Sequence, residues 1–229
     1  MARKLVAEAI GTFFLVLTVG MVVLEPGAGA FAGIAIGVAL MIMIYAAGHI
    51  SGGHLNPAVT LAVFMRGKAT AAELGGYIVA QLAAAALAAI AVQFLKGDIS
   101  VSAAVLDPGP VLLAEFLFTF ALCYTVLNVA TAPGNDGNSF YGFAIGGVVL
   151  VGVYAVGGVS GAAFNPAVAT GVVILGIVAG SDIWLFLLAN FAGGAAAALV
   201  FNGLRMAEDK PTAATASEQQ ALRSPATPI

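Results

Sequence analysis

The tripeptide Asn-Pro-Ala occurs twice in the sequence, each time at the start of a short apolar stretch. The six residues are Asn56, Pro57, Ala58, Asn165, Pro166 and Ala167. Asn is a strong helix N-cap and Pro is favoured at the first helical position, so each copy predicts the start of a helix. Such a start presents unpaired N–H groups and the positive end of the helix dipole. Two of them facing each other inside a membrane would donate hydrogen bonds to water and repel cations.

One Asn-Pro pair alone indicates only a turn, so the surroundings of the two motifs decide between the alternatives. Residues 51–59 are Ser-Gly-Gly-His-Leu-Asn-Pro-Ala-Val, and residues 160–168 are Ser-Gly-Ala-Ala-Phe-Asn-Pro-Ala-Val. Glu8 and Glu115 also lie in similar apolar contexts, 107 positions apart, whereas the two Asn residues lie 109 positions apart. Two features in the same order at nearly the same offset indicate a duplicated half of about 110 residues.

The composition places these motifs in a membrane. Of the 229 residues, 61% are hydrophobic and only 8% are charged, whereas about a quarter of a soluble domain is charged. The sequence therefore excludes a soluble protein, and it has no basic face for binding nucleic acid. The single cysteine, Cys123, excludes an intrachain disulfide.

Six apolar segments reach the roughly 20 residues that a membrane-spanning helix needs. They cover about residues 5–24, 31–49, 73–95, 110–130, 140–158 and 183–204. Two shorter apolar stretches, 56–65 and 165–176, are expected to enter the membrane without crossing it. Each half has three spans, an odd number, so the second half inserts in the opposite orientation. The predicted fold is an all-α membrane protein with six transmembrane helices and two re-entrant half-helices in an inverted repeat.

The basic residues predict the orientation of the chain. With the N-terminus in the cytoplasm, seven of the eight Lys and Arg residues lie on the cytoplasmic side, which is a clear positive-inside bias. These seven are Arg3, Lys4, Arg66, Lys68, Arg205, Lys210 and Arg223, and the eighth, Lys96, lies outside. We expect a multi-pass protein of the cell membrane with both termini in the cytoplasm. Residues 207–229, rich in Ala, Thr and Ser, predict a disordered cytoplasmic tail.

Four titratable residues in the apolar part of the chain have open roles. Carboxyl groups are costly in a bilayer, so Glu8 and Glu115 should face the protein interior. They could couple proton movement in a gradient-driven secondary transporter, or accept hydrogen bonds from the extended backbone before each half-helix. Their equivalent positions in the two halves favour this support role. His49 and His54 flank the first extended segment, where they could line a pore mouth, act as a pH gate or serve loop packing.

The sequence resembles the aquaporins, the major intrinsic protein family, over about residues 5–205. The resemblance is carried by both Asn-Pro-Ala motifs, the repeated Glu and residues 48–60, Gly-His-Ile-Ser-Gly-Gly-His-Leu-Asn-Pro-Ala-Val-Thr. It implies a channel domain over residues 1–206, with one repeat over about 1–96 and the second over about 110–206. It also implies a homotetramer in the lipid bilayer, with a pore in each subunit for passive transport of water or small neutral solutes.

We expect no enzyme activity, cofactor or metal. The predicted spans contain no nucleophile–base pair, no paired carboxylates and no metal-ligand spacing.

The sequence departs from the family at the selectivity filter. Most aquaporins have an Arg three residues after the second Asn, and this chain has Val168. The family's spacing places the other filter positions at Ile36, Val153 and Ala162. Water-selective members usually have an aromatic residue at the first of these and His at the second. We therefore expect a wider, apolar filter that admits glycerol, ammonia, urea or neutral metalloid hydroxides such as arsenite. The alternative is a plain water pore.

Overall fold

The computed structural model describes residues 1–97 and 100–204, which form eight α-helices and three short 3-10 turns. The helices are α1 (Ala2–Val23), α2 (Ala32–Ser51), α3 (Pro57–Met65), α4 (Ala71–Lys96), α5 (Pro108–Thr131), α6 (Tyr141–Ser160), α7 (Pro166–Ile174) and α8 (Ile183–Gly203). All except α3 and α7 are long and apolar enough to cross a membrane. The predicted all-α fold with six spanning helices is therefore confirmed. The predicted tail, 207–229, lies outside the described residues, as do Arg205, Lys210 and Arg223.

The two halves of the chain repeat the same order of helices. α2 and α6 have 20 residues each, α3 and α7 have nine each, and both pairs are displaced by 109 positions. Gly52 directly follows α2 and Gly161 directly follows α6, and both C-cap glycines have a left-handed backbone conformation, with φ of 93° and 84°. This conformation suits glycine, and it turns the chain out of each helix into the extended segment before the next.

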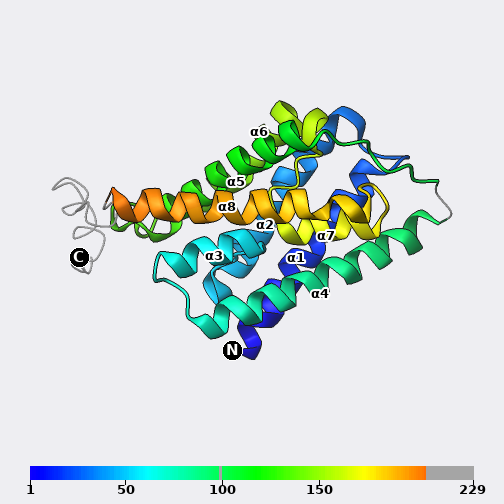
Figure 1. Cartoon of the computed structure of the whole chain (residues 1–229). Helices are drawn as coiled ribbons and strands as arrows, with labels where there is room; N and C mark the ends of the chain where they lie inside the picture. Colours follow the sequence, from blue (N-terminus) through cyan, green and yellow to red (C-terminus); the bar gives the residue numbers. More distant parts are fainter. Residues whose placement is uncertain (98–99, 205–229) are drawn as a thin grey trace, which may run out of the picture.

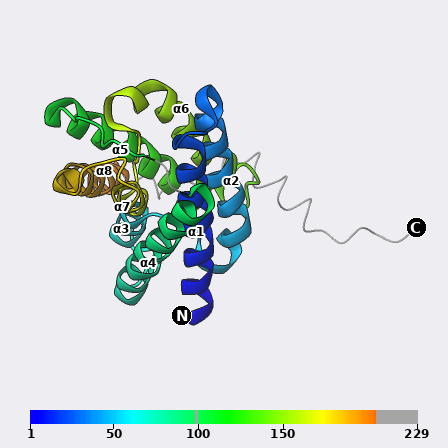
Figure 2. The ribbon, with the colours of Figure 1, turned by 90° about the vertical axis from the view of Figure 1, so that its right-hand side faces the viewer.

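Small residues let the two halves approach closely where α2 crosses α6. A Cβ atom added at Gly146 would lie 2.5 Å from the carbonyl oxygen of Gly37, and one added at Gly37 would lie 2.8 Å from the carbonyl oxygen of Gly146. Membrane helices associate through such small-residue contacts because lipid gives little hydrophobic drive for helix pairing. Elsewhere α1 packs on α2 and α4, and α5 packs on α6 and α8. Figure 1 and Figure 2 show these helices surrounding the two short ones.

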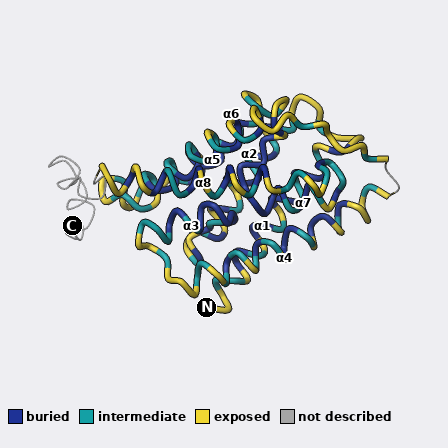
Figure 3. The backbone as a smooth tube through the Cα atoms, in the orientation of Figure 1, coloured by how far each residue is buried: buried dark blue, intermediate teal, exposed yellow. Residues whose placement is uncertain are grey.

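The short helices also tie the halves together, because each packs on a long helix of the opposite half. α3 contacts α8, and α7 contacts α4. Buried residues gather around the two short helices, whereas the outward faces of the long helices are exposed (Figure 3). These outward faces carry large apolar side chains such as Phe94, Phe143 and Leu199, as expected for surfaces that meet lipid.

Candidate functional site

The two Asn-Pro-Ala motifs start the two short helices. The Asn56 side-chain oxygen accepts hydrogen bonds from the backbone N–H groups of Ala58 at 2.8 Å and Val59 at 3.4 Å. The Asn165 side-chain oxygen accepts one from the N–H of Ala167 at 2.8 Å. Each Asn is thus the N-cap of its helix, with Pro in the first turn, where its missing N–H costs nothing.

The Asn side chains also connect the two halves at the centre of the molecule. The amide nitrogen of Asn56 donates to the carbonyl oxygen of Phe164, and that of Asn165 donates to the carbonyl oxygen of Leu55, both at 2.9 Å. Leu55 and Phe164 have φ values of 51° and 47°, a conformation that non-glycine residues rarely adopt. Each amide nitrogen carries two hydrogens, so one N–H of each Asn is left over from this exchange.

Glu8 and Glu115 are fully buried and hold the extended segment before each short helix. The carboxyl group of Glu8 accepts four hydrogen bonds, from the Ser51 hydroxyl, the backbone N–H groups of His54 and Leu55, and the Gln81 amide, at 2.6–2.9 Å.

Glu115 repeats this arrangement in the second half. Its four donors are the Ser160 hydroxyl, the N–H groups of Ala163 and Phe164, and the Asn190 amide, at 2.7–3.0 Å. Each carboxyl therefore receives hydrogen bonds from both its loop and a neighbouring long helix, the geometry that a support role requires.

A cavity of about 140 Å³, called here the pore cavity, passes both Asn residues. Each of the four residues at the predicted filter positions lines it: Ile36, Val153, Ala162 and Val168. Among the described residues of its wall there is no Lys, Arg, Asp or Glu side chain. Its wall is thus apolar except for a few groups, chiefly the two Asn amides, His54 and Tyr141.

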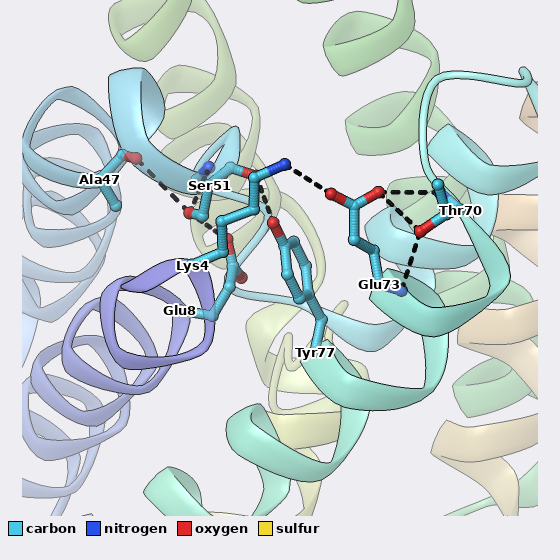
Figure 4. Close-up of polar contacts among 8 residues, drawn as sticks. Lys4, Glu8, Ala47, Ser51, Thr70, Glu73 and Tyr77 are labelled. Carbon is cyan, nitrogen blue, oxygen red and sulfur yellow. Dashed lines mark hydrogen bonds and ion pairs between the residues drawn. The ribbon is translucent and has the colours of Figure 1, made fainter. Parts of the chain in front are cut away.

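A second, wider cavity of about 890 Å³, called here the vestibule, opens at the end of the molecule that carries the N-terminus. Lys4 in α1 and Glu73 in α4 form an ion pair at 2.6 Å in its wall, and Glu73 also caps α4 with Thr70 (Figure 4). The Tyr77 hydroxyl donates to the carbonyl oxygen of Ser51 at 2.8 Å.

The structure separates the two histidines that the sequence could not tell apart. His49 is exposed and lines the vestibule but not the pore cavity. His54 is half-buried and lines both cavities. The His54 ring also packs edge-on against Tyr77, with ring centres 5.2 Å apart. Tyr141 lines both cavities as well. No motif marks it in the sequence, because the ring that it packs against, Tyr45 in α2, lies 96 positions away.

Comparison with known proteins is consistent with this architecture. The family described as "MIP: Major intrinsic protein" matches residues 1–201. The chain belongs to the major intrinsic protein family. This confirms the resemblance to aquaporins, and it places the chain in a family of channels for water and small solutes.

Curated relatives match over most of their length. The chain is 36% identical over 217 residues to "Aquaporin NIP1-4" of Oryza sativa subsp. japonica, covering 91% of this chain and 79% of the relative. It is 38% identical over 232 residues to "Nodulin-26" of Glycine max, covering 96% and 84%. The fold is similar to that of the aquaglyceroporin from Plasmodium falciparum, with a TM-score of 0.73 at 21% identity, covering 87% of this chain and 95% of that one.

Proposed function

We propose that the pore cavity is the transport path of a passive channel, and that this channel admits neutral solutes larger than water, such as glycerol, urea, ammonia or arsenite. The observation that carries the proposal is the wall at the predicted filter. Ile36, Val153, Ala162 and Val168 all face the pore cavity, and none of them brings a charge or a hydrogen-bonding side chain. Selectivity at this level therefore depends on size and on the cost of removing hydration.

An apolar filter changes which solute passes most easily. A molecule that enters such a wall gives up hydrogen bonds to bulk water, and each uncompensated one is costly. A compact, weakly hydrated solute loses less than a strongly hydrated one of equal size. Without an Arg side chain at residue 168, more of the cross-section is also open. Neutral solutes with a few polar groups are thus favoured over ions.

Cations are excluded at the centre of the pore. The N-termini of α3 and α7 meet there, and each contributes roughly half a positive elementary charge from its helix dipole. The remaining N–H of Asn56 and of Asn165 donates to the oxygen of a passing water or hydroxyl group. A hydronium ion or a metal cation gains no acceptor from these groups and meets two positive dipole ends.

A gradient-coupled transporter using Glu8 and Glu115 has less support. Both carboxyl groups are buried and accept four hydrogen bonds each from their own loops and neighbouring helices. Neither is among the described residues that line the pore cavity. A coupling site must exchange its ion with the transport path, and this arrangement offers no such contact.

We further propose a homotetramer in the cell membrane, with both termini in the cytoplasm and one pore in each subunit over residues 1–206. The distribution of basic residues supports the orientation, since Lys4 and Lys68 line the vestibule. Lys96, by contrast, donates to the carbonyl oxygen of Leu24, at the C-terminal end of α1. Cross-linking and light scattering in detergent test the assembly, and accessibility of a terminal tag in intact cells tests the orientation.

The solute range is tested with purified protein in lipid vesicles, by stopped-flow light scattering with water, urea and glycerol. We expect flux of all three, driven by each solute's own gradient and unchanged when a proton or sodium gradient is imposed. Flux that requires either ion gradient would instead support the transporter. Empty vesicles and vesicles with heat-inactivated protein serve as controls for leakage through the bilayer.

A further inference from the structure

The backbone ends the two short helices in the same way. Each helix closes with a Schellman motif around a glycine whose φ is 76°, Gly67 after α3 and Gly176 after α7. In this motif, backbone N–H groups beyond the helix donate to carbonyl oxygens of its last turn, at 2.8–3.0 Å in both copies. Most acceptors at each helix end are therefore satisfied by the chain's own backbone.

The last carbonyl oxygen of each short helix accepts a hydrogen bond from the opposite half. The Asn202 amide of α8 donates to the carbonyl oxygen of Met65 at 3.0 Å, and the Gln93 amide of α4 donates to that of Ile174 at 3.2 Å. The offset of 109 positions relates these two contacts, as it relates the two motifs. Neither helix end thus needs a cationic side chain to satisfy its carbonyl groups.

The two ends differ at the residue that directly follows the short helix. After α7 this residue is Leu175, which is buried, and after α3 it is Arg66. The guanidinium carbon of Arg66 lies over the ring of Phe201 in α8, 5.1 Å from the ring centre. The side chain therefore lies at the seam where α3 packs along the C-terminal part of α8 (Figure 1). Because a Leu fits the same backbone in the other half, the fold does not require the charge.

The charge of Arg66 has no partner within residues 1–97 and 100–204. The guanidinium group forms no ion pair there, and its Nε atom is buried without an acceptor. Lys96, at the other end of the molecule, donates to the carbonyl oxygens of Leu24 and Pro26, and Lys4 forms an ion pair in the vestibule wall. A half-buried guanidinium at a membrane surface is stabilised by an anion that accepts from its remaining N–H groups.

The surroundings of Arg66 combine a further donor with an apolar surface. Asn202 is exposed and uses one of its two amide hydrogens on Met65, so the other is left to donate. Leu199 lies three positions earlier on the same side of α8, and its side chain and that of Leu204 are 64% and 66% exposed. A molecule with a phosphate group and acyl chains meets suitable contacts for both parts here.

We propose that Arg66 and Asn202 form a binding site for the phosphate group of an anionic phospholipid, at the end of the seam between α3 and α8. The guanidinium group of Arg66 pairs with the phosphate, and the second N–H of Asn202 donates to one of its oxygens. The cytoplasmic leaflet is rich in anionic lipids, and the proposed orientation of the chain places this seam end there. The inference rests on that orientation and is independent of the proposed solute range.

Three substitutions test the site. Arg66→Leu removes the charge and has the side chain that the equivalent end of α7 already accommodates. Arg66→Lys keeps the charge but loses the planar group that stacks on a ring and forks to a phosphate. Arg3→Gln is the matched control, because Arg3 is exposed and its loss lowers the cytoplasmic charge by the same amount. Both arginines lie outside the walls of the two cavities, so all three variants should keep wild-type water permeability in vesicles of neutral lipid.

Native mass spectrometry of the full-length protein in detergent measures the binding. The probes are phosphatidylglycerol and phosphatidylcholine with identical acyl chains, with excess inorganic phosphate as a competitor. We expect wild type to prefer phosphatidylglycerol, and Arg66→Leu to bind it about three- to tenfold more weakly. Arg66→Lys should lie between them, Arg3→Gln should stay within about twofold of wild type, and phosphatidylcholine should bind equally to all four proteins.

Several results would overturn the site. One is equal affinity for phosphatidylglycerol in wild type and Arg66→Leu. Another is an equal loss in Arg3→Gln, because the attraction would then belong to the surface charge as a whole. Displacement of the lipid by inorganic phosphate would assign the site to a free anion instead. If Arg66→Leu lacks wild-type water permeability, Arg66→Lys decides in its place, and wild-type lipid affinity in that variant would contradict the proposal.

Discussion

Asn56 and Asn165 each hold the loop of the opposite half, because the amide of each donates to the carbonyl oxygen directly before the other Asn at 2.9 Å. The same side chains cap α3 and α7 through their oxygens. Each Asn therefore caps its own short helix and holds the loop of the opposite half, and one of its two amide hydrogens stays free for a further hydrogen bond. The two halves cannot move apart at this point without breaking both exchanges.

Replacing Asn165 with Asp tests this exchange. The carboxyl group can still cap α7, but it has no N–H for the carbonyl oxygen of Leu55 and adds a negative charge at the centre of the pore. A buried acceptor without a donor costs about 1–3 kcal/mol, so the midpoint of thermal unfolding in detergent should fall. Water permeability should fall with it. An unchanged midpoint would show that the exchange contributes nothing to stability.

Glu8→Gln tests the support role of the carboxyl groups. The amide nitrogen of Gln is a donor, so it faces at least one of the four donors that Glu8 now accepts from. We expect about 1–3 kcal/mol of destabilisation from the unsatisfied groups, measured as a lower unfolding midpoint. Glu73→Gln is the control, because its ion pair with the partly exposed Lys4 should contribute less than about 1 kcal/mol. A larger loss for Glu73→Gln than for Glu8→Gln would contradict the assignment.

The contact between α2 and α6 predicts unequal effects of two neighbouring glycines. In Gly146→Ala the new Cβ atom would meet the carbonyl oxygen of Gly37 at 2.5 Å, so the helices must separate, at a cost of about 1–3 kcal/mol. In Gly147→Ala the new atom has no neighbour within 4 Å. Thermal unfolding should distinguish the two variants, and equal midpoints would show that the close approach is dispensable.

Protons should be excluded even though the filter has no charge. The barrier lies at the N-termini of α3 and α7, where dipole ends and Asn amides offer donors but repel hydronium. Vesicles loaded with a pH-sensitive dye and placed in a pH step should acidify no faster with the protein than without it. Acidification that rises in proportion to water flux would show that the helix ends alone do not exclude protons.

The sequence was informative about the fold because its strongest signals are local or repeated. Apolar length predicts the six spanning helices, and Asn followed by Pro predicts the starts of α3 and α7 within a residue. Glu8 and Glu115 lie 48 and 50 positions before the Asn residues of their motifs. This nearly equal spacing indicates equivalent roles, and the structure gives both residues equivalent sets of donors.

The parts that sequence reasoning missed depend on contacts between distant segments. Nothing around Asn56 identifies Phe164 as its acceptor, since the bond requires the left-handed backbone of Phe164 and the approach of the other half. No motif in the sequence identifies Tyr141; the one pattern is that the equivalent position in the first half, 109 residues earlier, is the small residue Ala32. Comparing equivalent positions of the two halves along the pore wall could have identified Tyr141.

Two substitutions of Val168 separate the effect of side-chain volume on glycerol permeability from the effect of charge. Val168→Leu adds volume to the pore wall without charge, whereas Val168→Arg adds both. We expect a modest loss of glycerol permeability in the first and a much larger loss in the second, with protein content per vesicle matched. Equal losses would show that size alone limits the solute range.

The ratio of glycerol to water permeability in wild type and in Val168→Arg tests the central claim most directly. We predict measurable glycerol flux in wild type and a ratio at least about tenfold lower in the Arg variant, because the side chain narrows the filter and fixes a charge there. A wild type that conducts water alone, with the same ratio in Val168→Arg, would contradict the account.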